Sequence, residues 1–430
     1  MNAEGGRRAL LAVALATPLV MPVQAAPHGC APRAPSVLEL ARKPPAGAKT
    51  TPARRASQPD PEFDAAAREA TAAREAGRLE DAIRLYEKAL ARRPSWAEGL
   101  WYLGTINYDL DRYAEAADAF RRLVALQPKN GPAWAFKGLC EFQLRNYERA
   151  LDDLRRAGAF GFGDTGELKS VARYHLALLL AREGQFEMAL TTLAAFAQEG
   201  NDSPKVIEAF GLATLRQPLL PAELPADRRE MVLIAGRASY YQAQRQNAAA
   251  RKAFEELAFR YPAAPNVHYA FGVFLLVENP DEAIGKFRRE LEVSPYHVPA
   301  RIQLAFEYNK RGEFERALPF AREAVELAPN DFPARKAYGE ALLGLGRVAE
   351  AVEQLERGVT LAPDSPGMRY ALARAYARAG RSEDAARERA EFLRLDKLYR
   401  TQRAGPQAVG GIIDRVESVP NRPPDRQPPP

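Results

Sequence analysis

The sequence predicts an all-α solenoid, a fold in which pairs of helices stack one on the next. Three features of its 430 residues predict this fold: an alanine that recurs at a regular interval, a proline twelve residues after it in most units, and apolar residues every three to four positions. Apolar residues at that spacing indicate amphipathic helices. One such pair cannot bury its apolar faces alone, so the pairs must stack. Five of the eight intervals between the alanines are 34 residues long, and the alanines are Ala82, Ala116, Ala150, Ala189, Ala250, Ala283, Ala317, Ala351 and Ala385.

Each unit carries the residues that a helix pair needs at fixed places. A small residue such as Gly104 lies twelve positions before the repeat alanine and allows the two helices to approach closely. A large apolar residue such as Phe120 lies four positions after the alanine and fills the space between neighbouring units. Pro128 and its equivalents end the second helix, because proline cannot continue a helix. In the sixth unit the small residue Gly272 lies only eleven positions before Ala283, which predicts a turn one residue shorter.

These units resemble tetratricopeptide repeats, which are helix-turn-helix motifs of 34 residues. The resemblance covers about nine units, from Phe63 to Phe392, and rests on the agreement of period, small residues, large apolar residues and prolines. It implies a right-handed superhelix, a right-handed α-solenoid, in which the first helix of each unit lines a concave face and partner polypeptides lie along that face. The family's clamp for a terminal carboxylate is not implied, because Ala67, Thr71 and Thr105 stand at the places of its lysine and asparagines.

The repeat pattern lapses once, and this lapse predicts two blocks. Residues 61–200 are expected to form the first block, and residues 229–402 the second block with a capping helix at its end. Between them, residues 201–228 predict one helix, Pro204 to Arg216, followed by an irregular stretch rich in proline. This segment is either a hinge or a rigid insertion, and the sequence leaves both open.

The two ends of the chain differ in composition from the repeats. Residues 1–25 place a basic pair, an apolar stretch and small residues in the order of a secretory signal peptide. Residues 26–60, rich in proline and alanine, predict a disordered spacer, and residues 403–430 predict a disordered, proline-rich tail. We therefore expect export to the periplasm or the cell envelope. A signal retained as an anchor and lipidation of Cys30 are the alternatives.

Charge and residue counts argue against several classes of function. Lys and Arg number 61 against 55 Asp and Glu, an evenly spread excess that does not predict nucleic-acid binding. Two cysteines and four well-separated histidines predict no metal site. Acidic residues before the repeat alanines are explained by the stabilisation of negative charge at helix starts. We expect a protein that is not an enzyme, with no catalytic residues, cofactor, metal or small-molecule substrate.

The candidate binding site is the concave face. In the repeat register its side chains come from the first helix of each unit, and the first block supplies most of the aromatic ones. Aromatic side chains give a large contact area at little entropic cost. The candidate partner-binding residues are Trp101, Thr105, Tyr108, Leu139, Phe142, Tyr174, Gln242, Tyr269, Phe306, Asn309 and Arg374.

The leading hypothesis for function is a non-enzymatic scaffold of the cell envelope that binds segments of other proteins on this face. The alternative is an accessory subunit of an envelope secretion, pilus or polysaccharide-export assembly, associated peripherally with a membrane complex. Two weaker hypotheses are an active site within residues 201–228 and occupation of the groove by residues 408–419 of the same chain.

Overall fold

The computed structural model describes residues 60–163 and 166–404, and these residues form helices and turns with no β-strand among them. The predicted signal peptide, spacer and tail, together with residues 408–419 and Cys30, lie outside the described residues. In the part of the chain that is described, no helix is both long and apolar enough to cross a membrane.

The first block and the segment after it contain nine α-helices and two short 3₁₀ helices. They are α2 (Pro61–Glu75), α3 (Leu79–Arg92), α4 (Ala97–Asp109), α5 (Tyr113–Leu126), α6 (Gly131–Gln143), α7 (Tyr147–Phe160), α8 (Gly166–Arg182), α9 (Phe186–Gln198), α10 (Pro204–Thr214), η2 (Pro221–Glu223) and η3 (Ala226–Arg228).

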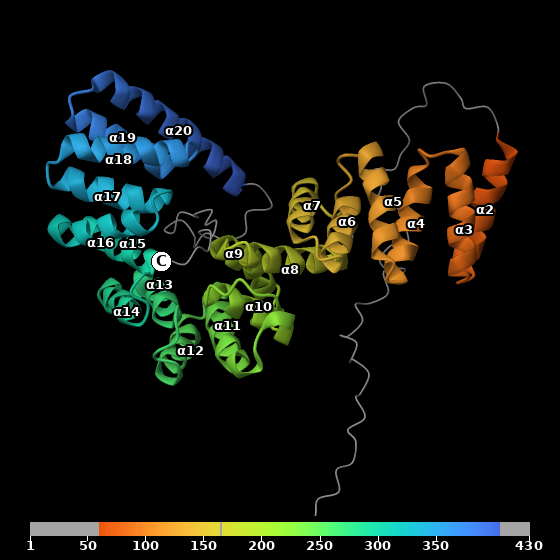
Figure 1. Ribbon diagram of the computed structural model, residues 1–430, viewed down its shortest axis with the longest axis horizontal. Helices are drawn as coiled ribbons and strands as arrows, with labels where there is room; N and C mark the ends of the chain where they lie inside the picture. Colours follow the sequence, from red (N-terminus) through yellow and green to blue (C-terminus); the bar gives the residue numbers. More distant parts are fainter. Residues whose placement is uncertain (1–59, 164–165, 405–430) are drawn as a thin grey trace, which may run out of the picture.

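The second block continues with ten helices. They are α11 (Arg229–Ala243), α12 (Asn247–Arg260), α13 (Val267–Glu278), α14 (Pro280–Val293), α15 (Val298–Lys310), α16 (Phe314–Leu327), α17 (Phe332–Gly344), α18 (Val348–Leu361), α19 (Pro366–Arg378) and α20 (Ser382–Ala404). Figure 1 shows α2–α7 as a row of helices and the later helices curving round into an open arc. The all-α solenoid of helix pairs predicted by the sequence is confirmed.

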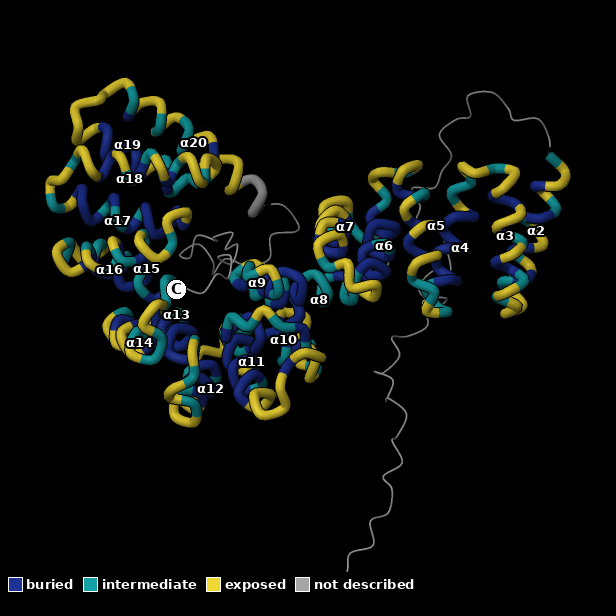
Figure 2. Tube along the Cα trace, in the orientation of Figure 1, coloured by how far each residue is buried: buried dark blue, intermediate teal, exposed yellow. Residues whose placement is uncertain are grey.

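Small and large residues meet between the helices of a unit as the repeat predicts. A Cβ atom added to Gly104 would lie 2.8 Å from the ring of Phe120, so only glycine permits this approach of α4 to α5. Phe120 is fully buried, and its ring stacks on Phe136 of the next unit with 5.2 Å between centroids. Figure 2 shows the buried positions concentrated where helices face one another. One large side chain therefore joins two units.

The three-residue turn inside most units has its middle residue in the left-handed region. Glycine supplies it in five units, and Gly346 with φ 75° is an example. Asp111, Arg145 and Arg245 adopt the same conformation with φ of 58–61°, although a side chain makes it costly. In the sixth unit Asn279 alone separates α13 from α14, whereas three residues separate the two helices of the other units, so the turn is shortened as predicted but by two residues rather than one.

A hydrogen bond to the repeat proline fixes the start of four units. In each, the proline carbonyl accepts a bond from a side-chain N–H six residues further on, and the donor is tryptophan, histidine or arginine. This proline-carbonyl bond satisfies a backbone group between two helices that would otherwise lack a partner. The pairs are Trp134 Nε1 to Pro128 O at 2.8 Å, His268 Nε2 to Pro262 O at 2.9 Å, Arg335 Nε to Pro329 O at 2.8 Å and Arg369 Nε to Pro363 O at 2.9 Å.

The irregular segment is tightly packed where α10 crosses α11. A Cβ on Gly211 would lie 1.9 Å from the carbonyl oxygen of Val232, and a Cβ on Gly236 would lie 1.9 Å from that of Ile207. Both glycines are therefore required by the contact of the two helix backbones. Phe210 of α10 belongs to the hydrophobic core of the first block, whereas its neighbour Leu212 belongs to that of the second.

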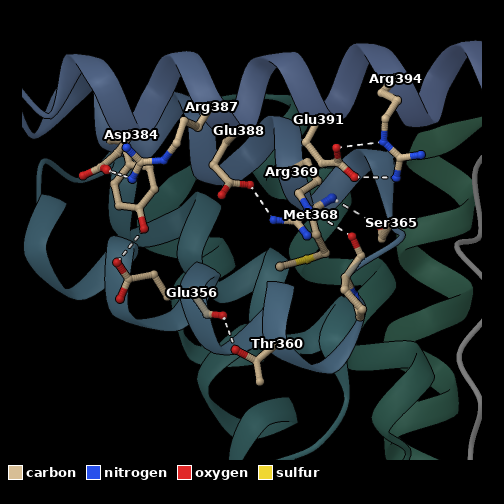
Figure 3. A network of polar contacts seen from close by, with 12 residues as sticks. Glu356, Thr360, Ser365, Met368, Arg369, Asp384, Arg387, Glu388, Glu391 and Arg394 are labelled. Atoms are coloured by element: carbon tan, nitrogen blue, oxygen red, sulfur yellow. Dashed lines mark hydrogen bonds and ion pairs between the residues drawn. The ribbon is translucent and has the colours of Figure 1, made fainter.

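The last helix covers the end of the array. Ala385 and Leu395 of α20 are buried, and Arg369 of α19 donates to Glu388 of α20 at 2.9 Å. Figure 3 shows this pair beside the Arg394–Glu391 pair, which lies within α20. The helix thus combines an apolar side with a charged outer side, as a terminal helix of a solenoid requires.

Candidate protein-binding surface

The structure separates the candidate residues by exposure. All eleven lie on the first helices of their units, in α4, α6, α8, α11, α13, α15 and α19. Those that are half-buried or exposed remain accessible to a partner: Tyr108, Phe142, Tyr174, Gln242, Phe306, Asn309 and Arg374. Those that are at most 5% exposed are Trp101, Thr105, Leu139 and Tyr269.

The buried candidates hold the helices together. The ring of Trp101 lies edge-on to Phe120 and Phe136, with centroid distances of 5.9 and 5.6 Å. The hydroxyl of Thr105 donates to the carbonyl of Tyr102 in its own helix at 3.1 Å. Successive first helices pack so closely that the side chains of these four candidates are buried between them. We therefore base the binding surface on the accessible candidates alone.

Three accessible aromatic residues follow one another on α4, α6 and α8. Tyr108 lies 5.5 Å from Phe136 between ring centroids. Phe142 lies 4.6 Å from His175, and Tyr174 lies 5.4 Å from the same imidazole. These edge-to-face contacts hold the rings while leaving part of each surface free. The first block thus presents a row of preorganised aromatic groups.

The tyrosine, histidine and cysteine side chains along this row are uncharged at neutral pH. Burial raises the pKa of Tyr174 to about 12 and also raises that of Tyr108. Burial lowers the pKa of His175, whose Nδ1 lies 2.8 Å from the carbonyl oxygen of Val171. The thiol pKa of Cys140 is raised by burial as well, so it behaves as a small apolar group rather than a nucleophile.

The second block combines its aromatic groups with cations. The Lys336 ammonium lies 5.4 Å from the ring centroid of Phe306, and the Arg374 guanidinium lies 5.9 Å from that of Tyr370. Asn309 donates from Nδ2 to the carbonyl of Ala337 at 2.8 Å, so its amide also ties α15 to α17. A cation also lies over the aromatic row of the first block, since the Lys205 ammonium is 5.6 Å from the ring centroid of Tyr174.

A cluster around Arg216 links the two blocks, and sequence reasoning missed it. Arg216 follows α10 and donates to Glu187 of α9 at 2.5 Å. Its guanidinium lies 4.7 Å from the ring of Phe186 and 5.6 Å from that of Tyr269 in α13. Tyr269 is thus a contact between the blocks. The sequence offered only a lone arginine within an apolar stretch, a signal too weak to find this cluster.

The described residues contain no group of three or more His, Cys, Asp or Glu side chains that could hold a metal ion. Their ion pairs join arginine or lysine to one or two carboxylates, such as Lys137 to Asp153 at 2.5 Å between α6 and α7 and Arg251 to both Glu255 and Glu282.

Family models of the tetratricopeptide repeat match along the chain. They cover residues 67–131, 112–164 and 236–298, residues 308–366 and 342–388, and residues 170–195. Together these matches span more than half of the sequence, and the chain belongs to the tetratricopeptide repeat family. It is accordingly a protein-interaction scaffold.

Individual relatives are more distant. A general transcriptional corepressor, trfA of Dictyostelium discoideum, is 27% identical over 81 residues, which make up 19% of this chain and 6% of the corepressor. The chain thus spans a small part of that relative's length. Among solved structures, MamA residues 41 to the end from Desulfovibrio magneticus RS-1 is 21% identical, with 39% of this chain and 96% of MamA covered and a TM-score of 0.36. A MamA RS-1 double mutant is 20% identical, with coverage of 41% and 98% and a TM-score of 0.36.

Proposed function

We propose that the protein is a non-catalytic scaffold of the cell envelope that binds extended segments of partner polypeptides along its concave face. The observation that carries the proposal is the row formed by Tyr108, Phe142 and Tyr174. These three side chains come from successive first helices, are partly accessible and are held by neighbouring rings. Membership of the tetratricopeptide repeat family supports a role in binding protein.

The spacing of the row suits an extended peptide. Packed helices lie roughly 8–10 Å apart, and an extended chain advances about 3.3 Å per residue. A segment that crosses the first helices at right angles therefore meets one aromatic residue about every three residues. Apolar side chains at that interval would each contact one ring of the row.

The second block would contribute selectivity through charge. Arg374 is exposed on α19, and Lys336 lies over Phe306 on the neighbouring surface. A partner with acidic residues beyond its apolar part would be attracted to these cations. Such charge complementarity raises the association rate and discriminates between partners.

Site-specific photocrosslinking in the native cell tests the binding surface. A benzophenone side chain at Tyr174 or Phe142 should crosslink to a polypeptide partner, and it should do so more strongly than one at Phe160. Phe160 is 45% exposed at the end of α7 and provides the control. Equal yields at the three positions would refute the surface. A crosslinked subunit of a membrane-embedded assembly would assign the protein to the accessory-subunit alternative.

The envelope location is tested separately. Residues 1–60 fused to alkaline phosphatase, which is active only after export, should give active enzyme if these residues carry a signal peptide. Replacing Arg7 and Arg8 by glutamate should abolish that activity, since a signal peptide needs its basic start. An unaltered fusion that is produced but inactive would contradict the signal peptide and with it the envelope location.

A further inference from the structure

A groove of 580 Å³ lies on the outer side of the first block, between α3 and α5 with α4 at its base. Leu103 and Asn107 of α4 line its base. None of the candidate partner-binding residues is among the residues that line the groove. The groove is therefore separate from the concave face. Its other lining residues are Glu87, Leu90, Ala91, Ala114, Glu115, Asp118, Ala119 and Arg122.

Two later units of the same chain show how this space can be filled. Asn107 lies nine positions before Ala116, and the residues nine positions before the alanines of the seventh and ninth units are Tyr308 and Tyr376. Tyr308 is fully buried, and Tyr376 is 8% exposed. Two units thus close the equivalent space with a tyrosine of their own, whereas the second unit places a shorter amide there.

The contacts of Tyr308 correspond position by position to the lining of the groove. Its ring lies 6.0 Å from Phe320 between centroids, and the guanidinium of Arg316 lies 4.3 Å from the ring. In the second unit the equivalent residues are Ala119 for Phe320 and Glu115 for Arg316. The groove is therefore open because two aromatic side chains are missing, and an acid replaces the arginine at its edge.

The contacts of Tyr376 add a polar partner. Its hydroxyl donates to Glu356 Oε1 at 2.7 Å, and the guanidinium of Arg381 lies 4.1 Å from its ring centroid. Glu356 lies five positions after its repeat alanine, and Glu87 lies five positions after Ala82. Glu87 is therefore at the position where a tyrosine hydroxyl is bound in the ninth unit.

We propose that this groove binds a tyrosine side chain of a partner protein, with an arginine next to that tyrosine in the partner sequence. The ring would occupy the space of Tyr308 and Tyr376, and its hydroxyl would donate to Glu87. The arginine would pair with Glu115 and lie over the ring, as Arg316 and Arg381 do within this chain. Glu87 and Glu115 are exposed, and neither has an ion-pair partner among the residues that the structure describes.

The tyrosine must come from outside the described array. Residues 1–59 and 405–430 contain no tyrosine, so these two segments cannot supply it. The volume of the groove lies within the range of pockets that bind small ligands, about 300–1,000 Å³, and exceeds what one ring needs. The occupant is thus a tyrosine together with the flanking part of a partner segment.

Fluorescence anisotropy with the full chain and a defined peptide tests the proposal. The probe is the labelled peptide Gly-Ser-Arg-Tyr-Arg-Ser-Gly, compared with versions in which alanine or phenylalanine replaces tyrosine or glutamate replaces both arginines. We expect the alanine and glutamate peptides to bind at least tenfold more weakly, and the phenylalanine peptide to bind more weakly than the tyrosine peptide. Equal binding of the tyrosine and alanine peptides would overturn the proposal.

Variants of the protein locate the binding. Asn107→Tyr fills the groove as in the seventh unit and should weaken peptide binding at least tenfold, with the helical circular-dichroism signal retained. The double variant Glu87→Arg/Glu115→Arg should do the same without adding an aromatic group.

The double variant Glu148→Arg/Asp152→Arg reverses two exposed charges on α7 and is the matched control. Its affinity for the peptide should stay within twofold of wild type, whereas a loss equal to that of the groove variant would overturn the proposal. If the chain self-associates and Asn107→Tyr abolishes this association, the occupant of the groove is a second copy of the chain. That result would overturn the proposal of a foreign partner.

Discussion

The first and second blocks are built on the same repeat but place different side chains at equivalent positions. Trp134 makes the proline-carbonyl bond in the first block, and Arg335 makes it in the second. Asn107 leaves a groove open where Tyr308 closes one. The backbone geometry is therefore set by small residues and turns, and the chemistry of each surface can change without altering it.

The largest effect is expected when an equivalent aromatic residue is removed from each block. Phe120 and Phe254 are both buried, and each ring stacks on that of the following unit. Phe120→Ala and Phe254→Ala should each lower the free energy of unfolding by about 3–5 kcal/mol, because each leaves a cavity between units. Urea unfolding followed by circular dichroism measures both.

Tryptophan fluorescence separates the blocks in that experiment, because all three tryptophans (Trp96, Trp101 and Trp134) lie in the first block. Phe120→Ala should shift the fluorescence transition directly. A loss of less than 1 kcal/mol at either phenylalanine would show that the two blocks do not share this packing.

A smaller effect is expected where the blocks meet. Gly236→Ala would place a Cβ against the carbonyl of Ile207 and should lower the free energy of unfolding by about 1–3 kcal/mol. Gly285→Ala on α14 meets no atom within 4 Å and should instead raise it by about 0.5–1 kcal/mol. The same effect at both glycines in urea unfolding would mean that α10 and α11 separate readily, as a hinge would.

Acid should weaken the second block through His297. Burial, with Arg216 and Arg301 nearby, lowers its pKa to about 3. Its Nδ1 accepts from the N–H of Ala300 at 3.0 Å, so it caps α15 as the neutral ring. Between pH 6.5 and 3 the unfolded chain holds a proton that the folded chain does not. The free energy of unfolding should therefore fall as pH falls, by up to about 1.4 kcal/mol per pH unit.

The matched variant for this effect is His297→Asn, because asparagine caps a helix without titrating. Urea unfolding at pH 7 and pH 5 should show a smaller loss of stability in the variant than in wild type. Identical losses in the two proteins would assign the acid sensitivity to other groups.

The smallest expected effect concerns the turns. Arg145 has φ 61° at the position where Gly346 has φ 75° in the eighth unit. Arg145→Gly should raise the free energy of unfolding by about 0.5–1 kcal/mol, since glycine avoids the steric cost of the left-handed region. The converse change, Gly346→Arg, should lower it. Thermal unfolding measures the change in stability of each variant. Stabilisation by both substitutions would contradict a steric cost of the left-handed conformation at these turn positions.

The sequence predicted most of the fold because its repeat has physical causes that are local. The repeat period, the glycine that faces Phe120 and the shortened turn at Asn279 can each be identified from one or two positions of the sequence. The exposure of the candidate site was harder to predict. Trp101 and Tyr108 lie seven residues apart and so share one face of α4, yet Trp101 is buried because Phe120 and Phe136 close around it.

Other features depended on contacts between distant parts of the chain. The Arg216 cluster joins α9, α10 and α13, and no periodic pattern encodes such a meeting. The groove at Asn107 did leave a signal, since a comparison of equivalent positions shows an amide where Tyr308 and Tyr376 stand in later units. That signal is found by comparing the residues at one position of the repeat, which differ from unit to unit, rather than by looking for the repeat itself.

The proline-carbonyl bond has a consequence for how such arrays vary. Trp134, His268 and Arg335 differ in chemistry, but each donates a side-chain N–H to the carbonyl of the proline six residues earlier. A substitution between chemically different residues can therefore leave the stacking of the helices unchanged, provided that the new side chain also donates a hydrogen bond to the proline carbonyl. Redesign of a single unit could exchange tryptophan for arginine here to alter solubility or surface charge while keeping the stacking angle to its neighbour.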